Sequence, residues 1–375
     1  MRCWLTIILG WVPLSSAFEE PLIKLKDGPP SAKAGPPTRL PGVPSNSPTR
    51  PSPLPSAPSR TGVPVLVRTR VTFPPTSKPT DATSFQNALA LLHSVRTKYD
   101  IDFSSTQQRI YTVQNFLKSL NTIHKLNTKS NLTAKHAVRF GLNEFSVLNV
   151  SSFSKNYKGV IIPEKKLQET TIVVHGRPKN LLGMSPAPIL KDWSGVLTTP
   201  IKNQAGCGCC YIFSAISQVE SDSIRISGQS NQLSVSVQQA LDCGGFSTIG
   251  GCNGGFPLGV YFYIERSIGV TRDALYPYVQ KKQSSCQLTT SAPVVVGVLN
   301  HYILTSNTEA DMAVYVQNTG PLSILVYAEQ WRLYKGGVMT AAICAYNGSV
   351  DHAVQLVGVD LSDPSNQYWI VRRSI

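Results

Sequence analysis

The stretch that decides the fold is Asn203-Gln-Ala-Gly-Cys-Gly-Cys-Cys-Tyr-Ile-Phe-Ser214, which places three cysteines within four positions. Gly206 and Gly208 interrupt regular backbone just before Cys210, and apolar residues then recur at helical spacing from 212 to 219. Cys210 is therefore predicted to begin a buried helix, whose N-terminus stabilises a thiolate. Because the thiolate is the reactive form of cysteine, Cys210 is a candidate nucleophile.

A cysteine cluster of this kind has two structural alternatives, a disulfide knot and a zinc site. No Cys-x-x-Cys pair has a His-x-x-x-His partner in the sequence, so we expect no metal and no other cofactor. The nucleophile interpretation gains a partner, because Val350-Asp-His-Ala-Val354 places His352 142 residues after Cys210. A histidine beside a cysteine can accept the thiol proton.

The positive charge of the chain is unevenly distributed. The 375 residues carry a formal net charge of +14, from 35 Lys/Arg and 21 Asp/Glu. From Lys191 onward there are 11 basic and 12 acidic residues, which leaves 24 basic and 9 acidic residues before it. The candidate catalytic region is thus nearly neutral, and we expect no nucleic-acid partner for it.

Two N-terminal stretches lie outside the predicted folded domains. Residues 1–17 combine one arginine, the apolar run 5–12 and small residues before Ala17, which predicts a secretory signal peptide. The run is too short to span a bilayer, so we expect no membrane anchor. Residues 18–80 are rich in Pro, Ser, Arg and Lys and predict a disordered segment, with a ligand for proline-reading domains as the alternative. Sequons agree with the secretory compartment and lie at Asn131, Asn149 and Asn347.

Helical periodicity returns after the Pro-rich stretch. Apolar residues recur every three or four positions over 83–99 and again from Ser105 to Asn127, and a short extended stretch is expected over 140–145. A plain helical hairpin domain is one interpretation of this pattern. Residues 170–188 are punctuated by proline and are expected to be loose, with a maturation cut at 184–189.

The motif Cys207-Gly-Cys-Cys-Tyr211 resembles that of the papain-like cysteine proteases at four of five positions, with Cys209 where Ser or Ala is usual. The resemblance implies an α+β fold over residues 186–375, with a helical left domain and a β-barrel-like right domain. It further implies that Cys210 is the nucleophile, that His352 is the acid/base, and that the amide of Gln204 contributes to an oxyanion hole.

The resemblance also assigns residues around this centre. Gly254 and Gly255 would let a substrate backbone approach closely, and Phe256 and Pro257 would line a pocket for a hydrophobic substrate side chain. Cys209 is expected to stay a reduced thiol, because adjacent residues at a helix start point about 100° apart. The implied disulfides are Cys207–Cys252 and Cys243–Cys286.

Residues 81–185 resemble the inhibitory propeptide of the same family. The matching positions of its two motifs are Phe116, Ile123 and Asn127, and then Gly141, Asn143 and Phe145. Thr112 and Ser119 stand where the family has Arg and Asn, and Val147 replaces an Asp.

The end of the chain departs from the family pattern. In the run Tyr368-Trp-Ile-Val-Arg-Arg-Ser-Ile375, Arg373 stands where the resemblance places the catalytic Asn. Arginine offers no acceptor to the imidazole of His352, and its charge disfavours the imidazolium. We also expect an open barrel edge and an unpaired Cys344, because the pattern continues beyond this point.

Taken together, the sequence predicts a monomeric cysteine endopeptidase zymogen, lysosomal or secreted, that cleaves proteins and peptides and is inhibited by its own propeptide. The run Ser236-Val-Gln-Gln239 is most similar to the cathepsin O branch of the family. The alternative, from a different functional class, is a catalytically impaired binding or regulatory protein with the same fold.

Overall fold

The structure, a computed structural model, describes residues 6–8, 82–130, 136–162, 172–175, 179–228, 233–245, 249–267, 269–289, 292–298, 302–305, 309–344 and 349–374. The chain divides into two compact units, and the one that comprises Met1–Gly28 and Pro79–Ile375 contains every described residue. The Pro-rich stretch 18–80 and the sequons at Asn131 and Asn347 lie outside the described residues. We call the described residues within 82–162 the N-terminal segment and those from 186 onward the C-terminal region.

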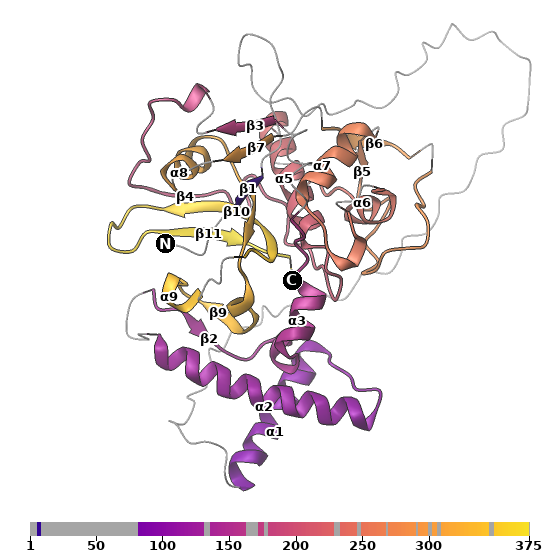
Figure 1. Cartoon of the computed structure of the whole chain (residues 1–375), viewed down its shortest axis with the longest axis vertical. Coiled ribbons are helices and arrows are strands. Elements are labelled where there is room, and N and C mark those ends of the chain that lie inside the picture. Colours follow the sequence, from indigo (N-terminus) through magenta and orange to yellow (C-terminus); the bar gives the residue numbers. More distant parts are fainter. Residues whose placement is uncertain are drawn as a thin grey trace, which may run out of the picture. The chain divides into compact units, whose positions relative to one another are not determined.

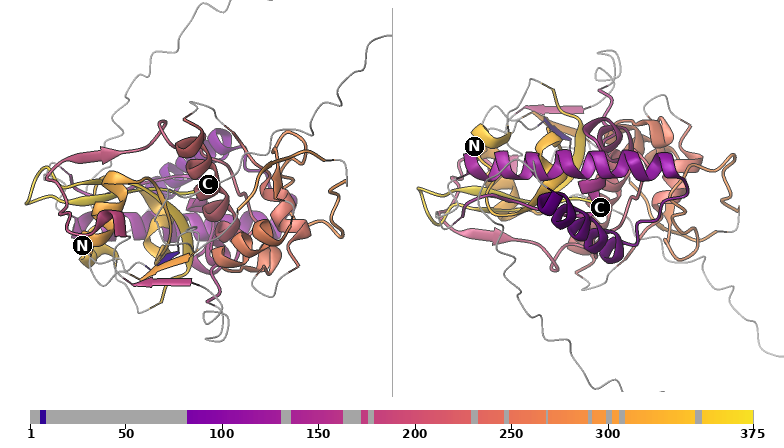
Figure 2. Two further views of the ribbon diagram at one scale, coloured as in Figure 1. Left: turned by 90° about the horizontal axis from the view of Figure 1, so that it is seen from above. Right: turned by 90° about the horizontal axis from the view of Figure 1, so that it is seen from below.

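Two helices form most of the N-terminal segment, as the periodicity predicts. α1 spans Ala82–Tyr99 and α2 spans Thr106–Lys129, and they pack against each other (Figures 1 and 2). The side chain of Ser105 accepts a hydrogen bond from the backbone amide three residues later, which caps α2. The apolar face of α2 buries Phe116 and Ile123.

The stretch after α2 is a strand only at its start. β2 spans Arg139–Phe140, and a 3₁₀ helix, η1, spans Glu144–Val147. The prediction of an extended stretch over 140–145 is therefore wrong at its end. The reason is a capping box. The side chain of Asn143 accepts a hydrogen bond from the backbone of Ser146, and the side chain of Ser146 accepts one from the backbone amide of Asn143.

Aromatic packing joins η1 to the helix α3, which spans Val150–Tyr157. The ring of Phe145 lies 4.8 Å from that of Tyr157 and 5.2 Å from that of Phe153, centroid to centroid. This edge-on cluster fixes the direction in which the chain leaves α3.

One half of the C-terminal region is built around the helix α5, which spans Cys210–Ser227. Most of α5 is buried, and it packs against α6, Val237–Cys243, and α7, Pro257–Arg266. The disulfides Cys207–Cys252 and Cys243–Cys286 close loops in this half and are the two pairs that the resemblance implies. Such loops stabilise the fold by restricting the unfolded chain.

A sheet forms the other half around the strand β10, His352–Asp360. β8 (Leu322–Val326) and β4 (Leu190–Asp192) pair antiparallel with one edge of β10, and β11 (Tyr368–Arg372) pairs with the other (Figure 1). β1, Thr6–Ile8, pairs with the far edge of β8. Among the described strands β11 pairs with β10 alone, so an open edge lies there. Helices on one side and an antiparallel sheet on the other confirm the α+β class.

The remaining elements are short. They are η2 Lys179–Leu181, η3 Gly251–Asn253, η4 Glu329–Leu333, α8 Glu309–Asn318, α9 Ala341–Cys344, β3 Ile172–His175, β5 Val270–Thr271, β6 Val294–Val296, β7 Tyr302–Thr305 and β9 Tyr334–Gly336.

Three of the short elements bear on the sequence analysis. β3 pairs in parallel with β7, so the stretch 170–188 is not loose throughout; its Ile-Val-Val run is β-branched and favours a strand. Cys344, at the end of α9, is disulfide-bonded, so the expectation of an unpaired thiol there is wrong. β1 lies within the stretch that was predicted to be a signal peptide.

Candidate active site

Cys210 is the first residue of α5, as the two preceding glycines predict, and its side chain is fully buried. The backbone amide of Ala353 donates to its sulfur at 3.5 Å. Because Ala353 follows His352 directly, this contact brings the two candidate catalytic residues together from opposite halves of the C-terminal region. α5 supplies one of them and β10 the other.

His352 is the first residue of β10 and is also buried. The indole of Trp331 meets its ring edge-on, with centroids 6.3 Å apart. The Nδ1 atom of His352 is buried without a hydrogen-bond partner. A buried polar atom in this state costs about 1–3 kcal/mol, so the site is short of one acceptor or donor for the imidazole.

The electrostatics of the site favour neutral forms of both residues. Burial raises the pKa of the Cys210 thiol to about 12, although backbone amides of Ala353 and Gly159 act against this shift. Burial lowers the pKa of His352 to about 3, and the charges of Arg373 and Lys158 add to that effect. In this state the pair is thiol and neutral imidazole, and not thiolate and imidazolium.

Gln204 lies six residues before Cys210 in the sequence and is almost fully buried. Its Nε2 donates to the carbonyl of Cys207 at 3.1 Å and to that of Tyr157 at 3.2 Å, and its Oε1 accepts from the hydroxyl of Ser374 at 2.5 Å. Hydrogen bonds therefore orient both the nitrogen and the oxygen of the side-chain amide. Its nitrogen donates to a carbonyl of the N-terminal segment, that of Tyr157. An amide held in this way can stabilise charge on a carbonyl oxygen.

Residues 158–161 of the N-terminal segment occupy the space in front of Cys210. Gly255 donates its amide to the carbonyl of Gly159 at 2.8 Å, and Ile161 donates to the carbonyl of Gly255 at 2.9 Å. Val160 and Gly255 thus form an isolated parallel β-bridge. Gly255, one of the two glycines expected to let a substrate backbone approach, therefore pairs with a backbone segment of this chain itself.

The approach of the two segments is closest at Gly159. A β-carbon on Gly159 would lie 1.9 Å from the carbonyl oxygen of Gly208, and one on Gly208 would lie 2.6 Å from the carbonyl oxygen of Cys252. Neither position can hold a side chain without a shift of backbone. The loop before Cys210 and the N-terminal segment are therefore fitted to each other.

An ion pair stands beside this contact. Nζ of Lys158 lies 2.6 Å from Oδ2 of Asp351, and Oδ1 of Asp351 accepts from the amide of Ala328. The carbonyl of Asp351 accepts from the amides of Gly159 and Val160 at 3.2 and 3.3 Å. The residue before His352 thus holds the N-terminal segment through both its side chain and its backbone.

The other residues named from the sequence lie close by. Phe256 is the N-cap of α7 and Pro257 its first residue; both are buried, and Phe256 belongs to the main core, against which Val160 also packs. Cys209 is a free, buried thiol whose sulfur lies 3.3 Å from the hydroxyl of Tyr278. Burial raises its pKa to about 12, which suits an inert thiol. Asn149 caps α3 and donates to the hydroxyl of Tyr111.

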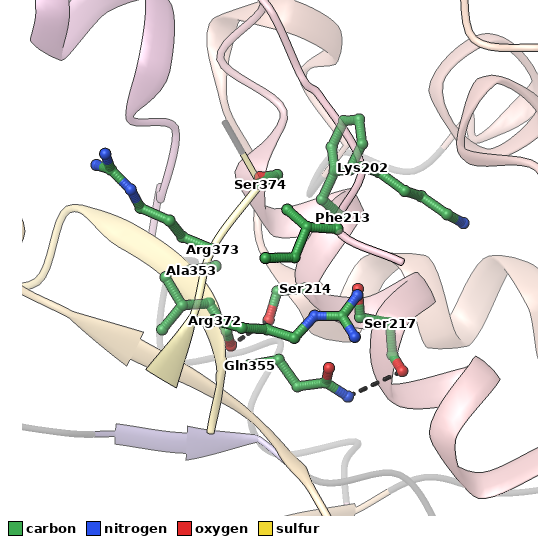
Figure 3. Close-up of a pocket in the computed structure, with 11 residues that line it drawn as sticks. Lys202, Phe213, Ser214, Ser217, Ala353, Gln355, Arg372, Arg373 and Ser374 are labelled. Atoms are coloured by element: carbon green, nitrogen blue, oxygen red, sulfur yellow. Dashed lines mark hydrogen bonds between the residues drawn. The ribbon is translucent and has the colours of Figure 1, made fainter. Parts of the chain in front are cut away.

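A small pocket lies between α5, the start of β10 and the end of β11 (Figure 3). Its walls include Phe213, Ser214 and Gln355, together with Arg372 at the end of β11 and Ser374 just after it. The hydroxyl of Ser214 donates to the carbonyl of Val354 at 2.7 Å. Cys210, Gly254 and Gly255 are not among the residues that line this pocket.

Sequence reasoning missed four residues that shape the site. Lys158, Gly159 and Asp351 hold the N-terminal segment in front of Cys210, and Arg332 binds it further away. Asp351 could have been suspected, because it precedes His352 directly. The other three carry no local pattern that separates them from ordinary Lys, Gly and Arg residues.

Two properties of the described residues concern metals and membranes. No group of three or more His, Cys, Asp or Glu side chains among them could hold a metal ion. None of the helices in these residues is long and apolar enough to cross a membrane.

Comparison with known proteins gives the family. Residues 187–374 match the papain family cysteine proteases. The chain is 31% identical to chymopapain of Carica papaya over 299 residues, which covers 78% of this chain and 79% of chymopapain. It is similar in structure to procathepsin L2 of Tenebrio molitor larval midgut, with a TM-score of 0.67 and 25% identity over 76% of this chain and 90% of that chain. The recombinant stem bromelain precursor gives a TM-score of 0.63 and 26% identity, over 77% and 87%. The chain therefore belongs to the papain family of cysteine proteases.

Proposed function

We propose that this chain is the zymogen of a cysteine endopeptidase whose nucleophile is Cys210. The observation that carries the proposal is the extended backbone at 159–161, which pairs with Gly255 beside Cys210. A cleft that pairs with the backbone of one peptide is suited to bind others once that peptide leaves. Procathepsin-type neighbours support the same interpretation, because they too carry a propeptide with the protease.

The chemistry proceeds in two stages, formation of a thioester on Cys210 and its hydrolysis. Cys210 gives its proton to His352, and the sulfur attacks the carbonyl carbon of the scissile peptide bond. The amide of Gln204 and a backbone N–H stabilise the oxygen as it gains charge. The carbon–nitrogen bond breaks, the amine leaves with the proton from His352, and water then hydrolyses the thioester to release the acid and restore the thiol.

The substrates we propose are proteins and peptides with a hydrophobic side chain two residues before the scissile bond. Phe256 and Pro257 would supply the apolar wall for that side chain. The predicted signal peptide and sequons support a site of action in the lysosome or outside the cell. Of the three sequons Asn149 is the described one, and its side chain is engaged in capping α3.

The second candidate function is a binding or regulatory protein with impaired catalysis. One observation favours it: Nδ1 of His352 has no partner, and Arg373 stands where the family's Asn would accept that N–H. The nearby guanidinium also lowers the pKa of His352 and so opposes an imidazolium. The two functions differ in whether Cys210 becomes a reactive thiolate after the N-terminal segment is displaced.

Labelling with an epoxide-type thiol probe separates the two candidates. The full chain would be treated with a trace of an unrelated protease at acidic pH to cut within 184–189, and the probe would then be added. Labelling that is lost in Cys210→Ala and kept in Cys209→Ser supports the enzyme, together with cleavage of a fluorogenic peptide. A cut and folded chain that takes no label at Cys210 supports the binding protein and contradicts the first proposal.

A further inference from the structure

The stretch between η2 and β4 is held at both ends and exposed in the middle. Leu181, the last residue of η2, is buried in the main core. Residues 182–185 are all exposed, and the amide of Met184 donates to the carbonyl of Leu181 at 3.3 Å, which closes a turn. Proteases cut folded proteins at exposed loop backbone of this kind. The exposed residues are therefore the accessible part of this stretch.

Gln317, in the last turn of α8, fixes the far end of the stretch. Its Oε1 accepts from the amide of Ala187 at 2.9 Å, and its Nε2 donates to the carbonyl of the same residue at 2.8 Å. Gln317 is buried, so both hydrogen bonds are shielded from water. The carbonyl of Ile189 accepts from the amide of Leu361 at 3.1 Å, and β4 then pairs with β10. Backbone from Ala187 onward must therefore leave these partners before it can enter a protease cleft.

The proposed active site requires a hydrophobic side chain two residues before the scissile bond, which excludes most bonds between 182 and 187. The bond after Leu182 would use Leu181, which is buried in the core. The bond before Pro186 would use Met184, but its nitrogen belongs to the proline ring, which fixes the backbone and leaves no N–H. The bonds after Met184 and Pro186 would use a glycine and a serine.

The bond between Gly183 and Met184 meets both requirements. It would use Leu182, which is 64% exposed. Gly183 has a φ of +78°, and a β-carbon there would meet nothing within 4 Å, so the residue faces open space. To lie along a cleft this backbone must become extended, and glycine makes that change without the steric cost that other residues meet.

We propose that a second copy of this chain cuts the bond between Gly183 and Met184, with the side chain of Leu182 bound against Phe256 of that copy. The proposal rests on the proposed function, because the cutting site is the one at Cys210. A second copy is needed whose own residues 159–161 have left the cleft. The new N-terminus is then the first residue of the stretch in which the sequence predicts the maturation cut.

The cut is a hydrolysis. The sulfur of Cys210 in the second copy bonds to the carbonyl carbon of Gly183, and the bond from that carbon to the nitrogen of Met184 breaks. This nitrogen leaves with the proton that His352 took from the thiol. Water then adds to the thioester, which yields the carboxyl group of Gly183 and restores the thiol. The contacts of Ala187 lie beyond the cut and remain in the product.

Limited proteolysis tests the accessibility of the bond without requiring catalysis by the chain. The full-length Cys210→Ala chain would be treated with a trace of subtilisin, and the cuts after η2 would be mapped by mass spectrometry. We expect cuts within 182–186 to form at least about tenfold faster than cuts within 187–189. Equal rates for the two groups of bonds would overturn the proposal.

Gln317→Leu tests whether the buried glutamine protects the far end of the stretch. In the same Cys210→Ala chain it should raise cutting within 187–189 about tenfold, because both hydrogen bonds to Ala187 are lost. The matched control is Asn318→Leu, since Asn318 is exposed and donates to a carbonyl of its own helix. Cutting that changes equally in the two variants would contradict the protective role of Gln317.

The choice of bond is tested with the chain as its own enzyme. Wild-type chain incubated at acidic pH with a reductant would be added to the Cys210→Ala chain, and the N-terminus of the product determined. We expect Met184. Leu182→Gln in the substrate should slow the cut about ten- to a hundredfold, because the apolar contact is lost. Leu190→Gln is the matched control: Leu190 is 54% exposed but lies in β4, and the rate should stay within about twofold.

The epoxide probe separates failure of this proposal from failure of the proposed function. If the probe labels Cys210 but the product begins at another residue, this proposal is overturned and the enzyme stands. The same holds if Leu182→Gln and its parent are cut at equal rates. If the probe stays silent and no product forms, the proposed function is refuted, and the self-made cut with it.

Discussion

Lys158 and Asp351 form an ion pair across the mouth of the active site, with Nζ of Lys158 2.6 Å from Oδ2 of Asp351. The lysine is buried and the aspartate is three-quarters buried. We expect Lys158→Met to loosen residues 158–161 and to speed alkylation of Cys210 in the intact chain about tenfold, because removal of one charge leaves the other partly desolvated. Lys155→Met, at an exposed position of α3, is the control and should leave the rate unchanged. Equal rates in both variants would show that the ion pair does not hold the segment.

Replacement of Gly159 by Ala tests the steric fit at the nucleophile loop. The new methyl group would lie 1.9 Å from the carbonyl oxygen of Gly208. The backbone must shift to make room for it. We expect the amides over 158–162 to lose most of their exchange protection, while α5 keeps its own. Gly245→Ala is the matched control, because a β-carbon there meets nothing within 4 Å. Retained protection in Gly159→Ala would contradict the close approach described above.

The buried neutral imidazole of His352 predicts a loss of stability in acid. Its pKa falls to about 3 in the folded chain from an ordinary 6.5. Between these values the unfolded chain binds a proton that the folded chain does not, so the free energy of unfolding decreases as pH falls, by up to about 1.4 kcal/mol per pH unit. Urea unfolding of the full chain from pH 7.5 to pH 3.5 should show this slope.

The control for that experiment compares two histidines. His352→Gln should flatten the slope, whereas His93→Gln, at an exposed position of α1, should leave it as in the wild type. If the free energy of unfolding of His352→Gln still decreases as steeply as pH falls, other groups cause the acid sensitivity.

Cys209 is expected to be a spectator. It is free, buried and paired with the hydroxyl of Tyr278. Cys209→Ser should keep the alkylation rate of Cys210 and the cleavage of a fluorogenic peptide within about twofold, since a serine hydroxyl can make the same contact. Peptide mapping of the non-reduced chain should find Cys209 and Cys210 as thiols. A bridge between Cys209 and Cys252 would reverse this assignment.

Much of the fold followed from local patterns in the sequence. The helices after Ser105 and at Cys210 were predicted because their apolar faces repeat every three or four residues and their first turns carry clear caps or glycine breaks. The two disulfides of the helical half were also anticipated, by resemblance. These features depend on neighbours in sequence or on a family pattern that the chain keeps.

The contacts that close the site could not be predicted in the same way. Asn143 and Ser146 form a capping box whose effect on residues 144–147 outweighed the extended appearance of that stretch. The meeting of Arg332 with Ser119 joins residues 213 positions apart, and no periodicity connects them. The local sequence around a lysine, a glycine or an arginine does not show whether the residue binds another segment or is exposed to solvent. The roles of these residues therefore depend on the tertiary fold.

Because Arg332 and its acceptors are far apart in the sequence, the acceptors are synthesised long before Arg332. Arg332 bonds residues made 184 to 213 positions earlier, and Arg373 is made later still. While the chain emerges from the ribosome, α1, α2 and α3 are made before either anchor, and the part of the Phe145 ring that Arg373 contacts stays open to water or to a chaperone. We therefore expect docking of these helices to be among the last folding steps. An intermediate with a formed α5 and undocked N-terminal helices should accumulate, because contacts so distant in sequence close slowly.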